Sequence, residues 1–501
     1  MVIMPGKTIL HAILKWAVRG AALLLLLAAC VAGGLVYGWT QVARALPPLR
    51  GWHLQAPPSE FTAADARPGY DFEAYRRQES QVFTELEALM AGPWSGEARG
   101  RFNRFRAASA CNPATLFDTN WNRTFVLESP APVGGALLVH GLSDSPYSLR
   151  AIGERLHAQG YTVVGLRVPG HGTCPAALAK VTKEDWTAAV RVAAAGLRRR
   201  IPGGAPLVLV GYSNGGALSV HYALECLDDA SLPRPQAIVL FSPMIGITRM
   251  AAVTRLHRPI AALSGEARAH WSSLGAEIDP FKYGAWPMNA SVQAFEITRR
   301  VEERLAALEQ AGRTAELPPI LAFQSAVDST VITPRLITQL FDRLARNGSE
   351  LVLFDVNRAG WLDNLVSLNF EQRVVPALRQ TTAPFALTLV TNASSESLEV
   401  VAKTRNGAEW SEVPLGASWP PGVFSLSHVA LPFRPDDPLY GTAEATRQTG
   451  LPLGSISARG ESGVLMISDG QLLRLRHNPF YEYTENHAIE WLQQALNRKG
   501  S

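Results

Sequence analysis

The sequence predicts an α/β protein built on a mostly parallel central sheet. From residue 134 onward, short apolar runs rich in β-branched residues alternate with longer amphipathic stretches. This alternation is typical of strand–helix–strand units, whose strands pair in parallel and are covered by helices. The alternation stops after residue 245 and resumes near residue 320, so an inserted segment interrupts the sheet.

The elements follow one another in a simple order. Strands are expected at residues 136–140, 161–166, 206–210, 237–241, 320–324 and 350–355, and helices at residues 145–159, 183–200, 215–227 and 335–346. Thr182, with Asp185 three residues later, approximates a capping box before the second helix. Residues 245–312 are expected to form helices and loops, and at roughly 65 residues they are too long for an ordinary connection.

Composition excludes several classes of protein. The chain has 501 residues with 47 Lys+Arg against 43 Asp+Glu, and no basic run with interleaved aromatic residues that would follow a phosphate backbone. Nucleic acid is therefore not an expected partner. The four cysteines include no C-x-x-C pair, so no metal site is expected. The length suits one large domain with insertions, or two domains.

The N-terminus predicts a membrane anchor within residues 1–44. Residues 21–39 carry no charged side chain, and 19 helical residues at 1.5 Å each approach the thickness of the hydrocarbon core. Lys7, Lys15 and Arg19 precede this stretch. Because positive flanks stay inside, the N-terminus is expected in the cytoplasm and the rest of the chain on the extracytoplasmic, periplasmic side.

Two other interpretations of this segment remain open. Residues 27–30, Leu-Ala-Ala-Cys, resemble the lipobox of bacterial lipoproteins, which would make Cys30 a lipidated N-terminus. A cleaved secretory signal is the third interpretation. Residues 31–39 stay apolar beyond the cleavage site, whereas a mature surface protein normally turns polar there, so the uncleaved anchor is preferred.

Residues 45–133 are expected to form a linker and an N-terminal helical region. Five prolines between residues 45 and 69 predict a stalk without regular packing. Residues 71–90 show helical spacing of apolar positions.

Ser213 is the predicted nucleophile. The sequence Gly-Tyr-Ser-Asn-Gly over residues 211–215 is a G-x-S-x-G motif that follows an apolar strand and opens a helix. In this context a sharp strand-to-helix turn exposes the serine hydroxyl as a nucleophile. The hydroxyl then needs a base, an orienting acid and donors for an oxyanion.

Main-chain amides supply the expected oxyanion hole. The turn His140-Gly141-Leu142 ends an upstream strand and can aim the Leu142 N–H into the site. Asn214, directly after the nucleophile, offers a second N–H at a helix N-terminus. His140 is expected to brace this turn rather than to act as the base.

These pieces resemble the α/β-hydrolase superfamily, in particular bacterial esterases and members of the lysophospholipase or monoacylglycerol-lipase type. The matching parts are His140-Gly141, Pro-Gly-His-Gly at residues 169–172, and the turn at Ser213. The resemblance covers residues 134–355. It implies an α/β-hydrolase domain over residues 134–501, a helical cap insertion at about 245–312, and a triad in the chain order Ser, acid, His.

Asp328 is the expected acid. It follows the strand at residues 320–324 in a loop that resembles the family's acid loop. Asp355, at the end of the next strand, is the rival. Asp355 lacks a flanking loop, so Asp328 is preferred.

His428 is the expected base, although the sequence departs from the family pattern here. Residues 346–383 contain no histidine, and His428 is the first candidate downstream of the acid. A second insertion at about 356–422 would explain the distance along the chain. Residues 383–422 fit a cap extension, a small β-subdomain or part of the main sheet. His477 and His487 are the alternative bases.

Export would also affect the cysteines, because disulfides can form in an oxidising compartment. Cys111 and Cys174 both lie in expected loops beside prolines, and a disulfide between them is predicted. Cys226 is expected on the helix after Ser213, buried and free.

The sequence thus predicts a membrane-anchored serine hydrolase that cleaves carboxylic esters through an acyl-enzyme. The expected substrate is a small-molecule or lipid ester, such as a monoacylglycerol or lysophospholipid, and no cofactor is required. No P-loop, no G-x-G-x-x-G after a strand and no H-E-x-x-H is present. A thioesterase or amidase with the same triad, and a catalytically silent scaffold, are the alternatives.

Overall fold

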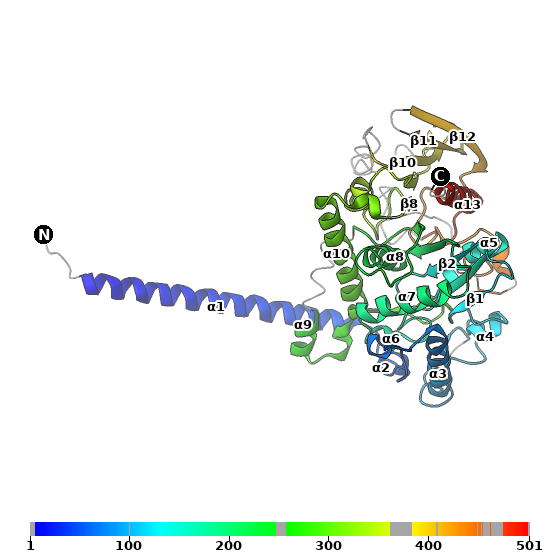
Figure 1. Ribbon diagram of the computed structural model, residues 1–501. Helices are drawn as coiled ribbons and strands as arrows, with labels where there is room; N and C mark the ends of the chain where they lie inside the picture. Colours follow the sequence, from blue (N-terminus) through cyan, green and yellow to red (C-terminus); the bar gives the residue numbers. More distant parts are fainter. Residues whose placement is uncertain are drawn as a thin grey trace.

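A computed structural model of the chain describes residues 6–99, 101–246, 257–360, 383–406, 409–447, 449–451, 453, 461 and 474–498. Over these residues it has an α/β-hydrolase fold, and a long N-terminal helix leaves the body (Figure 1). The predicted fold class is confirmed.

A ten-stranded sheet in the order β1-β3-β2-β4-β5-β8-β9-β10-β11-β12 forms the centre of the described structure. The strands from β3 to β10 pair in parallel along this order, whereas β1, β11 and β12 are antiparallel to their neighbours. Their bounds are β1 Phe125–Leu127, β2 Gly134–Val139, β3 Tyr161–Leu166, β4 Leu207–Tyr212, β5 Ala237–Phe241, β8 Ile320–Ser325, β9 Glu350–Phe354, β10 Ala386–Asn392, β11 Glu399–Asn406 and β12 Glu409–Ser418.

Helices cover both faces of the sheet, which explains why the parallel strands are continuously apolar. Along β2, Leu137 and Val139 belong to one core cluster, and Ala136 and Leu138 belong to the other. The first cluster lies under α7 (Lys183–Arg198), α8 (Asn214–Glu225) and α10 (Met288–Gln310), and the second under α5 (Arg150–Ala158) and α13 (Tyr481–Asn497). The capping box at Thr182 is present at the start of α7, as predicted.

The proline-rich segment, predicted to be a stalk, packs against the domain instead. Trp52, in the short helix α2 (Gly51–Leu54), and Phe61 are both buried. Apolar side chains placed between the prolines explain the difference, since they bury surface without needing regular structure. Helix α3 (Phe72–Ala91) follows, as predicted for residues 71–90.

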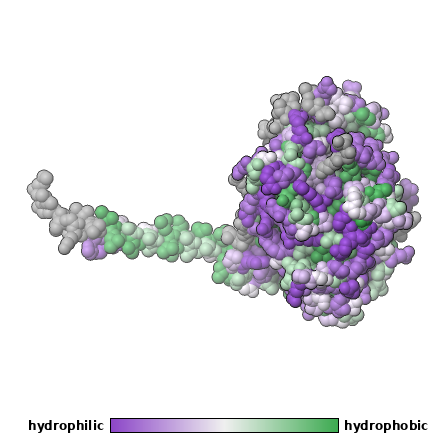
Figure 2. Space-filling model, viewed as in Figure 1, coloured by the Kyte–Doolittle hydropathy of each residue, from purple (hydrophilic) through white to green (hydrophobic). Residues whose placement is uncertain are grey.

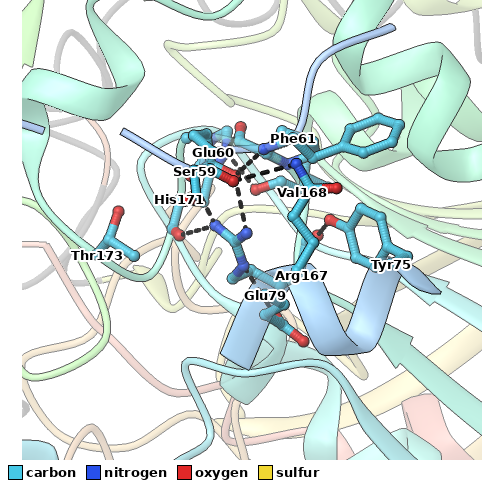
Figure 3. Close-up of polar contacts among 12 residues, drawn as sticks. Ser59, Glu60, Phe61, Tyr75, Glu79, Arg167, Val168, His171 and Thr173 are labelled. Carbon is cyan, nitrogen blue, oxygen red and sulfur yellow. Dashed lines mark hydrogen bonds and ion pairs between the residues drawn. The ribbon is translucent and has the colours of Figure 1, made fainter. Parts of the chain in front are cut away.

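A buried charge cluster holds this N-terminal segment to the sheet (Figure 3). Arg167, directly after β3, is completely buried and bonds Glu60 through Nη2 at 2.8 Å and Glu79 of α3 through Nε at 2.9 Å. The hydroxyl of Tyr75 donates to the Arg167 carbonyl at 2.5 Å. A buried guanidinium requires such paired, hydrogen-bonded partners. The segment before α3 is therefore part of the folded body.

Residues 386–406 and 409–418 include three strands of the main sheet, which differs from the expected insertion at about 356–422. Strand β10 pairs in parallel with β9, and β11 and β12 extend the sheet as an antiparallel pair. Residues 361–382 lie outside the described residues. The sequence pattern alone does not distinguish a small β-subdomain from part of the main sheet, because a strand has the same pattern in both.

The segment between β5 and β8, expected as a helical cap insertion at about 245–312, lies between two neighbouring strands of the sheet. Beyond residues 247–256, which are not described, it contains α9 (His257–Ser264), the short 3-10 helix η4 (Ala267–His270), a hairpin of β6 (Trp271–Leu274) and β7 (Ala285–Pro287), and α10. The hairpin was not expected from the sequence.

Glu277, in the loop between β6 and β7, is a buried carboxyl with one unsatisfied oxygen. Its Oε1 accepts the N–H groups of Gly284 and Ala285, at 3.1 and 2.9 Å. Its Oε2 has no hydrogen-bond partner in the described part of the chain. Burial raises the pKa of Glu277 to about 7, with Arg104 opposing the change.

Glu277→Gln should therefore stabilise the protein at alkaline pH. The folded-state pKa of Glu277 lies above its ordinary value of 4.5, so its stabilising proton is lost as the pH rises to about 7. Glutamine keeps the acceptor oxygen and cannot ionise. The variant should gain about 3 kcal/mol in the free energy of unfolding at pH 8 and almost nothing at pH 4.5. Urea denaturation of the detergent-purified chain at both pH values measures this, and an equal gain at both would contradict it.

Candidate active site

Ser213 lies on a sharp turn between β4 and α8 that only small neighbours permit. Its backbone has φ 53° and ψ −117°, a region that side chains rarely adopt. A Cβ on Gly215 would lie 1.9 Å from the Val139 carbonyl oxygen, and one on Gly211 would lie 2.6 Å from the Gly215 oxygen. The two glycines of the G-x-S-x-G motif are therefore required by this close approach.

The structure brings Ser213, His428 and Asp328 together. Nε2 of His428 lies 3.0 Å from the Ser213 Oγ, and Nδ1 lies 2.8 Å from Oδ2 of Asp328. All three side chains are buried. These are the hydrogen-bond distances that a nucleophile, a base and an orienting acid need.

Asp328 is held as an ionised acceptor. Its Oδ1 accepts the backbone N–H groups of Thr330 and Val331, at 2.7 and 2.9 Å, and its Oδ2 accepts Gln324 Nε2 at 2.9 Å. Burial alone would raise the pKa of Asp328, but His428 and these donors outweigh it and hold the pKa below its usual value. An ionised Asp328 requires a proton on Nδ1 of His428, which leaves Nε2 free to accept the Ser213 proton.

The turn at residues 140–142 comes close to the nucleophile. A Cβ on Gly141 would lie 3.1 Å from the Ser213 Cβ, so a side chain there would crowd the serine. Among the described residues, no protein acceptor is bonded to the backbone N–H of Leu142 or of Asn214. Both amides are available to a ligand.

His140 braces this turn. Its Nε2 accepts the Val168 N–H at 3.0 Å, so the proton lies on Nδ1, which donates to the Gly141 carbonyl at 2.8 Å. Holding the Gly141 carbonyl sets the plane of the peptide that carries the Leu142 N–H. Burial lowers the pKa of His140 well below its ordinary value, which keeps the imidazole neutral and this arrangement intact.

The residues considered as an alternative acid or alternative bases make other contacts. Asp355 pairs with Arg358, Nδ1 of His477 lies 3.1 Å from the Tyr440 carbonyl, and Nε2 of His487 lies 3.0 Å from Glu350.

The predicted Cys111–Cys174 disulfide is wrong, because both cysteines are free. Cys111 packs in a cluster with Tyr147 and Phe281, whereas Cys174 packs in a separate one with Trp52. Loop position and nearby prolines carry no information about which cluster a thiol joins. Cys226 is buried and free, as predicted, and Cys30 is exposed on the N-terminal helix.

Glu461 is a site residue that the sequence analysis missed. It is fully buried, and its Oε1 accepts the backbone N–H of His428 at 2.8 Å. Its Oε2 contacts the Ser329 hydroxyl and lies 3.4 Å from Arg474. Glu461 thus joins the loop of the base to the loop of the acid. It belongs to no recognisable motif, so the sequence contained no signal for it.

Glu461→Ala should lower kcat about tenfold, while Glu461→Gln should stay within about twofold of the native protein. Alanine leaves the His428 N–H without its acceptor, and a lost buried hydrogen bond costs about 1–3 kcal/mol. Glutamine keeps an acceptor oxygen at that place. Steady-state hydrolysis of a soluble ester by both variants measures the difference, and equal losses would indicate that the charge, rather than the hydrogen bond, matters.

The inserted segment is joined to the residues that follow the turn at 140–142. Lys282 Nζ lies 3.0 Å from Oδ2 of the buried Asp144, and the Tyr283 N–H donates to the Ser143 carbonyl at 2.9 Å. Tyr283 also donates its hydroxyl to the Gly170 carbonyl at 3.0 Å. The insertion therefore supports the wall of the site.

Comparison with known proteins finds similarity to hydrolases. Residues 130–357 match the family model described as serine aminopeptidase, S33. The chain is 36% identical over 89 residues to a thermostable monoacylglycerol lipase of Bacillus sp. (strain H-257), which is 18% of this chain and 34% of that protein. The chain thus spans about a third of the length of the curated relative it matches.

Two solved structures are also similar to part of this chain. One, described under the metagenome-derived lipolytic enzymes LipS and LipT, is 25% identical and covers 46% of this chain and 87% of its own, with a TM-score of 0.38. The monoacylglycerol lipase of Paleococcus ferrophilus is 18% identical and covers 46% of this chain and 89% of its own, with a TM-score of 0.34.

The sheet order and the turn at Ser213 define an α/β hydrolase. Residues 130–357, a little under half of the chain, match the serine aminopeptidase S33 family model, so this part of the chain is similar to that family of hydrolases. The resemblance found in the sequence is confirmed.

Proposed function

We propose that the protein is a membrane-anchored serine hydrolase that cleaves carboxylic esters through a Ser213-His428-Asp328 triad. The observation that carries the proposal is the pair of distances at His428, 3.0 Å from Nε2 to the Ser213 Oγ and 2.8 Å from Nδ1 to Asp328. An imidazole held at both nitrogens in this way serves as general base and then as general acid.

The reaction then has two halves. In the first, His428 takes the Ser213 proton while Oγ attacks the ester carbonyl carbon. The amides of Leu142 and Asn214 hold the resulting oxyanion, and the imidazolium returns the proton to the leaving alcohol. In the second half His428 deprotonates a water molecule, which attacks the carbonyl of the acyl-enzyme, and the imidazolium then gives this proton to the Ser213 Oγ as the bond to the acyl group breaks and the carboxylic acid leaves. Asp328 stabilises the imidazolium in both halves.

A lipid ester such as a monoacylglycerol or lysophospholipid is the proposed substrate. The relative from Bacillus bears the name monoacylglycerol lipase, although the match covers only 89 residues. Helix α1 (Gly6–Ala45) includes a stretch, Ile13–Ala45, that is long and apolar enough to cross a membrane by length and composition. Its apolar surface extends from the more polar body (Figure 2). An enzyme beside a bilayer meets esters with hydrophobic acyl chains.

The basic residues before the apolar stretch support a cytoplasmic N-terminus, with the catalytic domain on the periplasmic side. In this arrangement residues 1–44 form the anchor. Residues 45–133 pack on the hydrolase domain of residues 134–501. Lipidation at Cys30 after cleavage is the alternative attachment.

Fluorophosphonate labelling of the full chain in detergent tests the proposed chemistry. The native protein should be labelled, and Ser213→Ala should not. Absence of labelling in the native protein would favour a silent scaffold. Hydrolysis of esters graded by acyl length then tests the substrate, since a maximum at short acyl groups would count against a lipid.

A further inference from the structure

The C-terminal end of α1 is docked on the inserted segment. The Trp39 Nε1–H donates to the Ala269 carbonyl of η4 at 3.1 Å. Arg268 Nη1 donates to the carbonyls of Arg44 and Leu46, at 3.0 and 2.8 Å. Figure 1 shows α1 leaving the body beside α9. The helix and the insertion are therefore joined by specific hydrogen bonds.

Small side chains allow this docking to be close. Ala43 of α1, Ala261 of α9 and Ala269 of η4 form a buried cluster, and each is at most 3% exposed. Alanines at all three places let the helix backbones approach. A larger side chain at Ala43 would separate the two parts.

The length of α1 places this contact at a membrane surface. Arg19 is the last charged residue before the apolar stretch, and Trp39 lies 20 residues later. At 1.5 Å per residue this is about 30 Å, the thickness of the hydrocarbon core. Tyr37 and Trp39 are the residue types that gather at the interface. If Arg19 lies at one surface of the bilayer, the docked end of α1 lies at the other.

The insertion presents an exposed leucine beside this docked end. Residues 257–274, which we call the docking lobe, include α9, η4 and β6. On α9, His257 and Ala261 are buried, whereas Leu263 is 73% exposed. Beyond the docking lobe, the same insertion continues to Lys282 and Tyr283, which hold the oxyanion turn.

We propose that the docking lobe rests on the lipid bilayer, and that α1 holds it there. The bilayer is the partner because the apolar α1 is continuous with the contact, and because a span from Arg19 ends at Trp39. The lobe then brings the insertion, whose Lys282 and Tyr283 contact Asp144 and Ser143, to the membrane surface. Any effect of this placement on the cleavage of lipid esters rests on the proposed function, whereas the placement of the docking lobe itself does not.

A fluorescent probe at Leu263 tests the placement. The full chain carries Cys30→Ser and Leu263→Cys, labelled with an NBD group, because the other three cysteines are buried. The matched control is Val413→Cys on β12, which is 59% exposed and lies at the far edge of the sheet. In phosphatidylcholine/phosphatidylglycerol vesicles, doxyl lipids should quench the probe at 263 and not at 413. Equal quenching at both positions would overturn the proposal.

A second pair of variants tests the role of α1. Ala43→Leu should force the docked surfaces apart and at least halve the quenching at position 263, whereas Val42→Leu, at a neighbouring position that is 68% exposed, should leave it unchanged. Ala43→Leu should also lower the hydrolysis of monoacylglycerol in vesicles about fivefold, with a soluble butyrate ester unaffected. Unchanged quenching in Ala43→Leu would overturn the role of α1.

Fluorophosphonate labelling of Ser213 separates this proposal from the proposed function. Both α1 variants should be labelled as fast as the native protein in detergent. If the native protein is not labelled, the proposed function fails, while the quenching result still decides where the docking lobe lies.

Discussion

His428→Gln should lower kcat for ester hydrolysis by about 10⁵-fold, with little change in KM. The imidazole is the only group that the structure places against the Ser213 hydroxyl with a partner on its second nitrogen, within the described residues. Glutamine occupies a similar volume but cannot accept a proton at neutral pH. Ser213 then remains protonated and a poor nucleophile. Initial rates with a soluble ester, at enzyme concentrations that exclude contamination, measure the loss.

His487→Gln is the matched control. His487 lies on α13, where it pairs with Glu350, and it was an alternative base in the sequence. This variant should keep activity within about twofold. A large loss in His487→Gln, with a small one in His428→Gln, would reverse the assignment of the base. Circular dichroism of both variants excludes loss of folding as the cause.

Asp328→Asn should lower kcat by about 10⁴-fold. The side-chain amide of the variant can donate to Nδ1 of His428, where the native carboxylate accepts from it. Such a bond moves the imidazole proton to Nε2, which can then no longer accept the proton of Ser213. The variant also loses the negative charge that stabilises the imidazolium. The structural change is small, because aspartate and asparagine have nearly the same shape. The kcat of the purified variant on a soluble ester measures the loss.

Asp355→Asn is the control for the acid. Asp355 ends the next strand and pairs with Arg358 and with the Thr391 hydroxyl, at 2.8 Å to the latter. Its replacement should leave kcat within about threefold, although the melting temperature should fall because the buried Asp355 carboxylate loses its ion pair with the partly exposed Arg358. If both aspartate variants lose activity equally at unchanged stability, the assignment of Asp328 as the acid is wrong.

The sequence predicted correctly those structural features that a short segment of the chain determines by itself. Strands such as Leu207–Tyr212 are continuous β-branched and apolar runs, and a run of this kind is stable only when both faces are covered. The glycines around Ser213 predict a tight turn because only residues without a Cβ fit there, and the distances to Val139 confirm the reason. The start of α7 at Thr182 is equally local.

Contacts between distant segments were not predictable in the same way. Proline content near residue 50 predicted a stalk, yet Phe61 is buried in the main core and Glu60 pairs with Arg167. Loop position predicted a disulfide, yet Cys111 and Cys174 belong to different clusters. Both predictions used a local property of the sequence, either proline content or loop position, to infer contacts between segments that are distant along the chain.

By itself the sequence determined the parallel sheet, the nucleophile turn and the apolar N-terminal helix, because periodicity, glycine and hydrophobicity act within a few residues. Only the tertiary structure decided which of three histidines lies against Ser213, since 215 residues separate His428 from it along the chain. It also placed Glu461 behind that histidine and docked Trp39 on the inserted segment. Such pairings depend on how the whole core closes, which no local pattern specifies.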